Sequence, residues 1–264
     1  MRRLGVIGGG NMGSAILDGA LRAGVLEPSS VLVAEIDAER RVVIEAMGCA
    51  TSDSPRDAAS SPAIMLAVKP QQFGSVAAEI GPLATPTVVI SIMAGLSSDR
   101  IGAALGPEAR VVRTMPNIPA RVGAGITAIA LGANARPGDE ALAVALFDAV
   151  GRTVMVDEGA LHAVTAVSGS GPAYVFKLTE ALAAAARDVG LDRAVADRLA
   201  RQTVIGAARL LETSEDEPEA LRRAVTSPGG TTAAAIETME TEGFDELVRR
   251  AVAAARDRGR ELDQ

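Results

Sequence analysis

The sequence predicts a doubly wound α/β sheet over residues 1–157, followed by an all-α domain over residues 158–264. Two observations support this prediction. In the first part, short runs of apolar and β-branched residues alternate with segments of helical periodicity, as in a parallel sheet that helices cover on both faces. In the second part, Ala-rich helical patterns are separated by Gly and Pro, and no segment has the pattern of a strand.

The predicted strands of the first domain are continuous apolar runs, which indicate burial on both faces of the sheet. They cover residues 4–7, 31–35, 64–68, 87–92, 110–114, 126–131 and 153–156. The helical patterns between them cover residues 12–23, 38–47, 73–80, 98–105 and 139–150. Because open α/β sheets bind ligands beyond the carboxyl ends of their strands, we expect functional residues in the segments that follow the strands.

The second domain is predicted to consist of helices alone, over residues 160–167, 172–189, 193–212, 218–225, 231–240 and 244–261. Its most apolar stretch runs from Pro172 to Ala186 and contains Lys177 and Glu180. A membrane-spanning helix needs about 20 predominantly apolar residues. We therefore expect a buried or interface helix here, and no membrane span in the chain.

Composition excludes several classes of function. The net charge is -7, and the chain has four Phe, one Tyr and no Trp, so we expect no nucleic-acid partner. Cys49 and His162 are the one cysteine and the one histidine. One chain therefore contains neither a disulfide, nor a Ser-His-Asp triad, nor a multi-histidine metal site, and we expect no metal. His162 is expected to be a packed or capping residue.

The start of the chain and its cysteine content bear on localisation. Met1-Arg2-Arg3 leads directly into an apolar strand pattern, with no apolar segment of signal-peptide type before it. A single thiol fits a reducing compartment. We expect the cytoplasm.

A glycine-rich segment, Gly8-Gly9-Gly10-Asn11-Met12-Gly13, fits the pattern G-x-G-x-x-G between the first predicted strand and helix. In a Rossmann-type fold, Gly8 would permit the tight turn, Gly10 the approach of a pyrophosphate, and Gly13 close packing of the helix. The first N–H groups of the helix, at Asn11 and Met12, would face the phosphates. The segment predicts a dinucleotide site; the alternative is a structural turn.

Glu35 lies at the end of the second predicted strand, about 20 residues after the glycines, where a carboxylate commonly binds the ribose. This position favours NADH, because a carboxylate repels a 2′-phosphate. Arg40 and Arg41 follow closely and can pair with such a phosphate, so NADPH stays an alternative. The other interpretation of Glu35 is a solvated charge at a strand end.

Three further segments follow predicted strands and suggest a shared rim around the ribose and nicotinamide. Each alone also fits an ordinary turn. The cofactor-binding candidates that they contribute are Val68, Lys69, Pro70, Ala94, Gly95 and Asn117. For Lys69 three roles remain open: contact with the cofactor, contact with the substrate, or an ion pair within the loop.

A hydroxyl-rich turn is the most specific segment of the second domain. Pro228, Gly229 and Gly230 force a turn, and a predicted helix begins directly behind it. Hydroxyl side chains flank the turn at Thr226, Ser227, Thr231 and Thr232. Together with the N–H groups of a helix start, they form a natural receptor for a carboxylate. The alternative is a well-capped helix without a ligand.

The chain resembles the pyrroline-5-carboxylate reductase family. The resemblance is carried by the glycine-rich segment and by the Ser-Pro-Gly-Gly-Thr-Thr turn with its helix, which ends near Ile236 and Met239-Glu240. Three more segments match in the same order: residues 67–71 (AVKPQ), 113–117 (RTMPN) and 167–174 (VSGSGPAY). The matches cover both domains, and together they are far more specific than any one of them.

The resemblance implies an enzyme of proline biosynthesis, which transfers hydride from NADH or NADPH to the C=N bond of 1-pyrroline-5-carboxylate and forms L-proline. It implies a Rossmann-type first domain and a homodimer through the C-terminal helices, with substrate at the dimer interface and decamers in many members. The residues that it assigns to the substrate are Ser227, Gly229, Gly230, Thr231 and Thr232. Among them Thr232, with its hydroxyl on the ring nitrogen, is the catalytic candidate.

Two other functions compete with this interpretation. Another two-domain imine or 3-hydroxyacid reductase would usually have a catalytic lysine on a helix of the second domain, where Lys177 is the one lysine. A non-catalytic NAD(P)-binding redox sensor would not need the hydroxyl-rich turn. The sequence does not decide between NADH and NADPH, and it does not fix the oligomer size, feedback by proline or acceptance of the six-membered imine.

Overall fold

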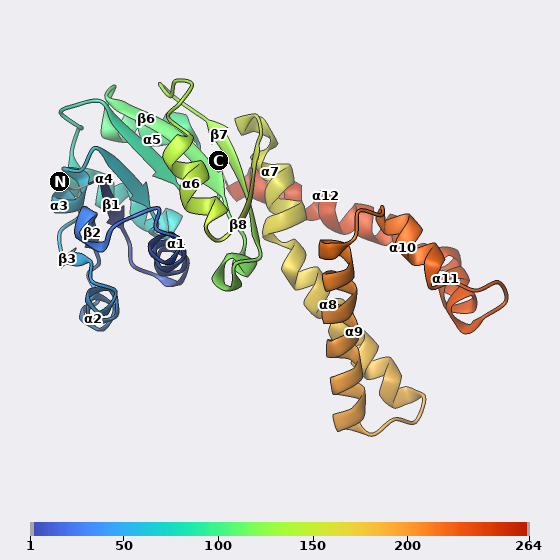
Figure 1. Ribbon diagram of the computed structural model, residues 1–264. Coiled ribbons are helices and arrows are strands. Elements are labelled where there is room, and N and C mark those ends of the chain that lie inside the picture. Colours follow the sequence, from blue (N-terminus) through green and yellow to red (C-terminus); the bar gives the residue numbers. More distant parts are fainter. Residues whose placement is uncertain (1–2, 263–264) are drawn as a thin grey trace. The chain divides into compact units, whose positions relative to one another are not determined.

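The computed structural model describes residues 3–262, which form two compact units (Figure 1). The first unit contains the chain up to Ser170 and the segment from Ala255 on; the second is Gly171–Ala254. The division thus falls after the sequence-based boundary at residue 157. The reason is that the segment just beyond that boundary packs on the sheet, where Leu161 is buried against Ala128 and Ala130.

The first unit is built on one sheet with the strand order β3-β2-β1-β4-β5-β6-β7-β8. Its strands are β1 (Leu4–Ile7), β2 (Val31–Ala34), β3 (Ala50–Ser52), β4 (Ala63–Leu66), β5 (Thr87–Ser91), β6 (Ala109–Met115), β7 (Gly125–Leu131) and β8 (Gly151–Met155). All neighbours pair in parallel except β6 and β7, which are antiparallel. The order of the first six strands is that of the Rossmann fold, so the carboxyl ends of β1, β4, β5 and β6 lie at one edge of the sheet.

Helices cover both faces of this sheet, as the sequence predicts. They are α1 (Asn11–Arg22), α2 (Ala38–Ala46), α3 (Pro55–Ala59), α4 (Phe73–Ile80), α5 (Ser98–Leu105), α6 (Ala141–Asp148) and α7 (Leu161–Val164). One core contains Ile16 of α1 and Phe147 of α6. The other contains Phe73 of α4 and Ile101 of α5. In β2 and β4 successive residues alternate between the two cores, which explains why these strands are apolar throughout.

The helices predicted at residues 73–80 and 98–105 are confirmed with the same bounds. Each is followed by a glycine with a positive φ, Gly81 at 72° and Gly106 at 89°, which stops the helix where few other residues fit. Strand β3 and helix α3 are absent from the prediction because they are too short to show a periodic pattern.

The second unit is helical and contains α8 (Gly171–Asp188), α9 (Arg193–Thr213), α10 (Pro218–Ala224), α11 (Thr231–Thr241) and the first part of α12 (Phe244–Leu262). Helices α8 and α9 pack against each other as a hairpin with Gly190, at a φ of 98°, in the turn between them. Between β8 and Leu262 the structure has no strand. Among the described helices, none is both long and apolar enough to cross a membrane.

The last part of α12 belongs to the first unit. A Cβ atom built on Gly259 would lie 3.4 Å from His162 Nδ1, and one built on Gly95 would lie 3.8 Å from the Leu262 carbonyl oxygen. The end of α12 therefore packs against α7 and against the loop that follows β5.

Candidate active site

The glycine-rich loop connects β1 to α1 at the carboxyl edge of the sheet. Gly8 has a φ of 102°, and a Cβ atom there would lie 2.7 Å from the Ala67 carbonyl oxygen. A Cβ atom at Gly13 would lie 2.6 Å from the Gly8 carbonyl oxygen, so α1 packs directly against the loop. At Gly10 the nearest described atom is Arg40 Nη1, at 3.8 Å from the Cβ position. The backbone of Gly10 is thus open to a ligand, while the other two glycines are required by close packing.

Glu35 is buried, with 7% of its surface exposed, and it supports the glycine-rich loop. Its Oε2 atom accepts a hydrogen bond from the Gly9 N–H at 2.8 Å, and its Oε1 atom accepts one from the Asp37 N–H at 3.0 Å. The alternative of a solvated strand-end charge is therefore wrong. The carboxylate fixes the loop and the start of α2 together.

Two arginines of α2 lie beside this carboxylate. Arg41 Nη1 donates to the carbonyl oxygens of Glu35 and Ile36, at 2.8 and 3.0 Å. Arg40 Nη1 is 3.8 Å from Glu35 Oε2, and the side chain of Arg40 is 54% exposed. The Arg40 guanidinium therefore combines solvent access with a position next to Gly10.

The loops after β4 and β5 contain the next predicted rim residues. Lys69 is exposed, and no ion pair within residues 3–262 includes it, so the structure does not support an ion pair within the loop as its role. Its N–H donates to Gln72 Oε1 at 3.3 Å. Val68 contacts the glycine-rich loop, because its Cγ1 atom would lie 3.0 Å from a Cβ atom on Gly8. Gly95 has a φ of 67°, which favours glycine at this turn.

Asn117 follows β6 and is buried, with 8% of its surface exposed. Its Oδ1 atom accepts a hydrogen bond from the Ile126 N–H at 3.0 Å. Its Nδ2 atom donates to the Ser168 carbonyl oxygen at 3.2 Å.

The segment that contains Ser168 differs from the prediction. The sequence predicts an α-helix over residues 160–167, but in the structure α7 ends at Val164 and the chain continues as a π-helical turn, Thr165–Gly169.

The hydroxyl-rich turn lies in the second unit, at the start of α11. Gly229 has a φ of 66°, and the Gly230 N–H donates to the Ser227 carbonyl oxygen at 3.0 Å. Gly230 is the N-cap residue, and no described side chain makes a capping hydrogen bond to α11. The hydroxyls of Ser227 and Thr231 therefore do not serve as a cap, which removes the simplest alternative to a binding role.

The structure groups the candidates into two sets, each within one unit. The cofactor-binding candidates from the loops after β1, β2, β4, β5 and β6 share the carboxyl edge of the first unit. The substrate-binding candidates Ser227 and Gly229–Thr232 share one turn of the second unit. Within the described residues, no group of three or more His, Cys, Asp and Glu side chains is arranged to hold a metal.

Known proteins match both parts of the chain. Residues 158–262 match the family model described as pyrroline-5-carboxylate reductase dimerisation, and residues 3–95 match the model described as NADP oxidoreductase coenzyme F420-dependent. A pyrroline-5-carboxylate reductase of Synechocystis is 43% identical over 262 residues, which cover 98% of each chain.

This chain belongs to the pyrroline-5-carboxylate reductase family.

Solved structures of this family have the same fold. The pyrroline-5-carboxylate reductase of Coxiella burnetii superimposes with a TM-score of 0.93 at 36% identity, covering 100% of this chain and 99% of that one. The Plasmodium falciparum pyrroline carboxylate reductase, solved with NADP bound, gives a TM-score of 0.85 at 29% identity, covering 100% and 98%. The α/β fold with a helical C-terminal part, and the family resemblance of the sequence, are confirmed.

A polar cluster around Glu158 was not predicted from the sequence. Glu158 accepts hydrogen bonds from the Ser98 N–H at 2.8 Å, from the Ser98 hydroxyl at 2.5 Å and from Arg113 Nη1 at 3.1 Å. Burial raises the pKa of the Glu158 carboxyl, but the hydrogen bonds from Ser98 and Arg113 and the Arg113 charge outweigh it and hold the pKa below its ordinary value. The signal was Arg113, a cation in an apolar strand, which needs a partner when buried.

Lys177, the lysine that a rival dehydrogenase would use, is 80% exposed and pairs with Glu180 at 3.3 Å. His162 is half-buried beside Gly259. Neither side chain has the buried, ligand-directed position of a catalytic group in this structure.

Proposed function

We propose that this chain reduces 1-pyrroline-5-carboxylate to L-proline with hydride from NADH or NADPH. The observation that carries the proposal is the 43% identity to a pyrroline-5-carboxylate reductase over 98% of both chains. Likeness over the whole length includes both the glycine-rich loop and the hydroxyl-rich turn. A redox sensor that binds dinucleotide alone would need only the first of these.

The dinucleotide fits the carboxyl edge of the first unit, because Gly10 leaves its backbone uncovered at the start of α1. When bound, it supplies the hydride for the imine carbon. The N–H groups of Asn11 and Met12 would face the pyrophosphate, since no described side chain caps α1. The cofactor-binding set that we propose is Gly8, Gly10, Asn11, Met12, Gly13, Val68, Lys69, Pro70, Ala94 and Gly95. We leave Glu35 and Asn117 out of the set that the sequence predicts, because their side chains form hydrogen bonds with the protein's own backbone.

The substrate carboxylate fits the uncapped start of α11. The N–H groups of Thr231 and Thr232, together with the Ser227 hydroxyl, supply the hydrogen-bond donors for an anion, while the Gly230 N–H is held by the Ser227 carbonyl oxygen. The Thr232 hydroxyl then orients the ring nitrogen and takes part in proton transfer to it. A protonated imine is already electrophilic, so the reaction depends on geometry and charge placement more than on a strong base.

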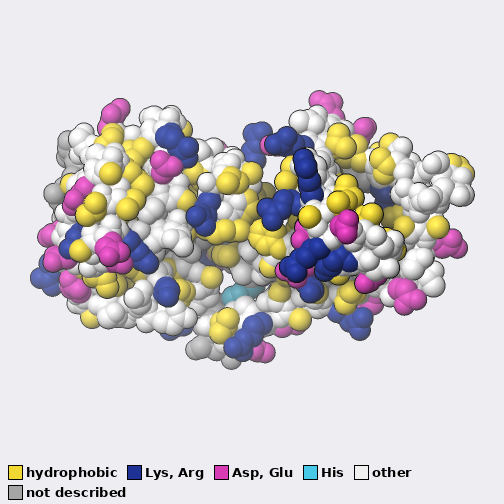
Figure 2. Space-filling view, turned by 90° about the horizontal axis from the view of Figure 1, so that it is seen from below, with side chains coloured by type: hydrophobic (Ala, Val, Ile, Leu, Met, Phe, Trp, Pro, Cys, Tyr) yellow, Lys and Arg dark blue, Asp and Glu magenta, His cyan; other side chains and the backbone are white. Residues whose placement is uncertain are grey.

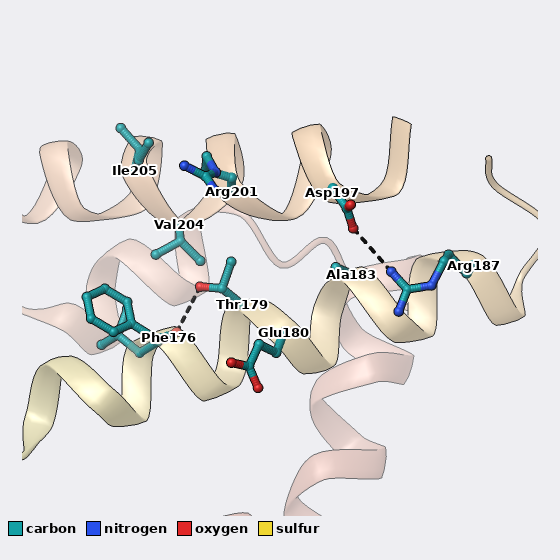
Figure 3. Close-up of a pocket in the computed structure, with 10 residues that line it drawn as sticks. Phe176, Thr179, Glu180, Ala183, Arg187, Asp197, Arg201, Val204 and Ile205 are labelled. Atoms are coloured by element: carbon teal, nitrogen blue, oxygen red, sulfur yellow. Dashed lines mark hydrogen bonds and ion pairs between the residues drawn. The ribbon is translucent and has the colours of Figure 1, made fainter. Parts of the chain in front are cut away.

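We also propose that two copies of the chain pair through the helices of the second unit. A groove of about 640 Å³ lies between α8 and α9. Figure 3 shows Arg187 and Asp197 paired across it, with Thr179 and Val204 between the helices. Large apolar side chains are exposed on these two helices, at Phe176, Leu178, Leu182, Val195, Leu199, Leu210 and Leu211.

Figure 2 shows hydrophobic side chains at the surface of the helical unit, between charged ones. Exposed apolar surface of this extent marks an interaction site, and residues 158–262 match a dimerisation model. We expect a dimer as the smallest assembly, and assembly of dimers into decamers as the larger one. Cys49 is buried and unpaired, which supports the cytoplasm as the compartment.

The test is oxidation of NADH and of NADPH, followed by absorbance with purified protein and 1-pyrroline-5-carboxylate, with proline identified as the product. Substrate-dependent oxidation with equimolar proline supports the proposal. No turnover by folded protein that still binds dinucleotide would overturn it, and the same assay with other cyclic imines and 3-hydroxyacids would then identify the rival enzyme.

A further inference from the structure

Each polar atom of the Asn117 side chain has a hydrogen-bond partner within the protein. The residue follows β6, which runs parallel to β5, so it lies at the carboxyl edge of the sheet. Its amide oxygen accepts from the Ile126 N–H at 3.0 Å, and its amide nitrogen donates to the Ser168 carbonyl oxygen at 3.2 Å. An amide that is buried and held at both ends is suited to connecting segments rather than to contacting a ligand.

The segment that Asn117 holds is the π-helical turn Thr165–Gly169. Its widened geometry appears in the hydrogen bond from the Ser170 N–H to the Thr165 carbonyl oxygen, at 2.8 Å. Insertions of this kind into α-helices are found frequently at functional sites, where they redirect the backbone. The turn forms the last part of the first unit before the chain enters α8.

A second contact joins this turn to β6. A Cβ atom on Gly169 would lie 2.8 Å from Met115 Cε, the end of a flexible side chain. Met115 is the last residue of β6. The turn therefore packs on the last side chain of the strand, and the amide of Asn117 ties it to the segment that follows.

We propose that Asn117 is a positioning residue, which holds the Thr165–Gly169 turn beside the carboxyl edge of the first unit, where the nicotinamide end of the dinucleotide would lie. The proposal rests on the proposed function. A shift of the turn would change the position of the nicotinamide ring, and with it the hydride-transfer geometry, while the pyrophosphate and adenosine contacts stay intact. Misplacement by about 1 Å can lower a rate roughly 100-fold.

The decisive variant is Asn117→Asp. It retains an oxygen that accepts from the Ile126 N–H, but it replaces the amide nitrogen by an oxygen that faces the Ser168 carbonyl and repels it. We expect kcat to fall roughly 10- to 100-fold. We expect the Kd of NADPH and NADH, measured by fluorescence titration, to change less than about threefold, because the residue does not bind the dinucleotide itself.

Asn134→Asp is the matched control. Asn134 Nδ2 also donates to loop carbonyl oxygens, those of Pro107 and Ala109 at 3.5 and 3.4 Å, but these lie at the opposite end of β6. The same chemical change there should leave kcat and both Kd values unchanged. The Tm values of both variants show whether a fall in kcat comes from a less stable fold.

Asn117→Ala tests the same role independently, and it decides the question if Asn117→Asp does not fold. It removes the hydrogen bonds to the Ile126 N–H and to the Ser168 carbonyl oxygen without placing a second oxygen opposite that carbonyl, so kcat should fall with little change in Kd. Full activity in both Asn117→Asp and Asn117→Ala, or a loss confined to the Kd of the dinucleotide, would overturn this role. A wild-type protein without turnover would instead overturn the proposed function.

Discussion

The starts of helices α5 and α11 differ in which groups accept hydrogen bonds from their first N–H groups. At α5 the chain supplies its own carboxylate, because Glu158 accepts from the Ser98 N–H at 2.8 Å, and the Ser97 hydroxyl adds a cap. At α11 the N-cap is Gly230, and none of the described side chains caps the helix. Helix α1, which begins after Gly10, is uncapped in the same way. At α5 the chain itself supplies the hydrogen-bond acceptors, whereas at the starts of α1 and α11 we assign anionic ligands to this role.

Glu158 also shows how hydrogen-bond donors at a helix start affect the pKa of a carboxylate. Its pKa is held below the ordinary value although burial alone would raise it. The donors are a helix N–H, a hydroxyl and a cation, which are groups of the kind that the turn at α11 offers, apart from the cation. A substrate carboxylate bound at α11 should therefore stay ionised, as hydrogen bonds to the charged form favour it.

The largest effect is expected at the turn of α11. Thr232→Ala should lower turnover roughly 10- to 1000-fold, the range between one positioning hydrogen bond and a proton relay. Thr238→Ala on the same helix is the control, because the Thr238 hydroxyl donates to the Ala234 carbonyl oxygen at 2.9 Å and is exposed. Steady-state kinetics of both variants test this role. An unchanged kcat in Thr232→Ala would show that the Thr232 hydroxyl is not catalytic.

At α1 the expected effect is on dinucleotide binding. Gly13→Ala places a Cβ atom 2.6 Å from the Gly8 carbonyl oxygen, so the helix start must move from the loop. We expect the Kd of the dinucleotide to rise roughly 10- to 100-fold. Gly74→Ala on α4 is the control, since no described atom lies within 4 Å of its Cβ position. Equal Kd values in calorimetric titrations of the two variants would contradict our account of α1.

A smaller effect is expected at Arg40, which lies beside the same loop. Arg40→Ala should raise KM for NADPH about tenfold, because a charge-assisted hydrogen bond to a 2′-phosphate is lost, and change KM for NADH less than about twofold. Arg22→Ala removes an arginine of α1 that is 73% exposed and paired with Asp18 at 2.8 Å, and it should change neither value. A similar rise in KM for NADPH and NADH would show that Arg40 does not bind the 2′-phosphate.

The smallest effect is expected at the carboxylate of Glu158. Because the pKa of Glu158 is lowered in the folded state, its contribution to stability is present above the ordinary carboxyl pKa of about 4.3 and is lost as the pH falls through the folded value. Glu158→Gln should therefore have a Tm a few degrees lower than wild type at pH 7. The difference should shrink below about pH 4, and thermal scans across this range will detect it. A constant difference would mean that the charge contributes nothing.

Much of the fold was predictable because it follows from local patterns. Apolar runs marked the strands, and helical periodicity marked helices over residues 73–80 and 98–105 that the structure confirms. The antiparallel pairing of β6 and β7 was not predictable in this way. It depends on the 3₁₀ turn Ile118–Val122, which returns the chain directly instead of crossing over with a helix, and such short turns have no clear periodicity.

The candidate site was predictable as a set of residue types but not as a set of contacts. Glu35 and Asn117 were selected as cofactor ligands from their place after a strand. Their hydrogen bonds to Gly9 and to Ser168 join segments far apart in the chain, and nothing in either local sequence indicates them. The π-helical turn was missed for a similar reason, because residues 160–167 carry an ordinary helical pattern and tertiary contacts widen it.

The route of α12 has a consequence for biosynthesis. The first unit includes the segment from Ala255 on, and Leu262 packs beside Gly95. A ribosome therefore releases the final piece of the dinucleotide-binding unit only after the whole helical unit has been translated. Contacts of such sequence separation form late and slowly. The loop after β5 lacks this contact until residues 255–262 have been synthesised, and a fragment that stops at Ser170 lacks part of the first unit.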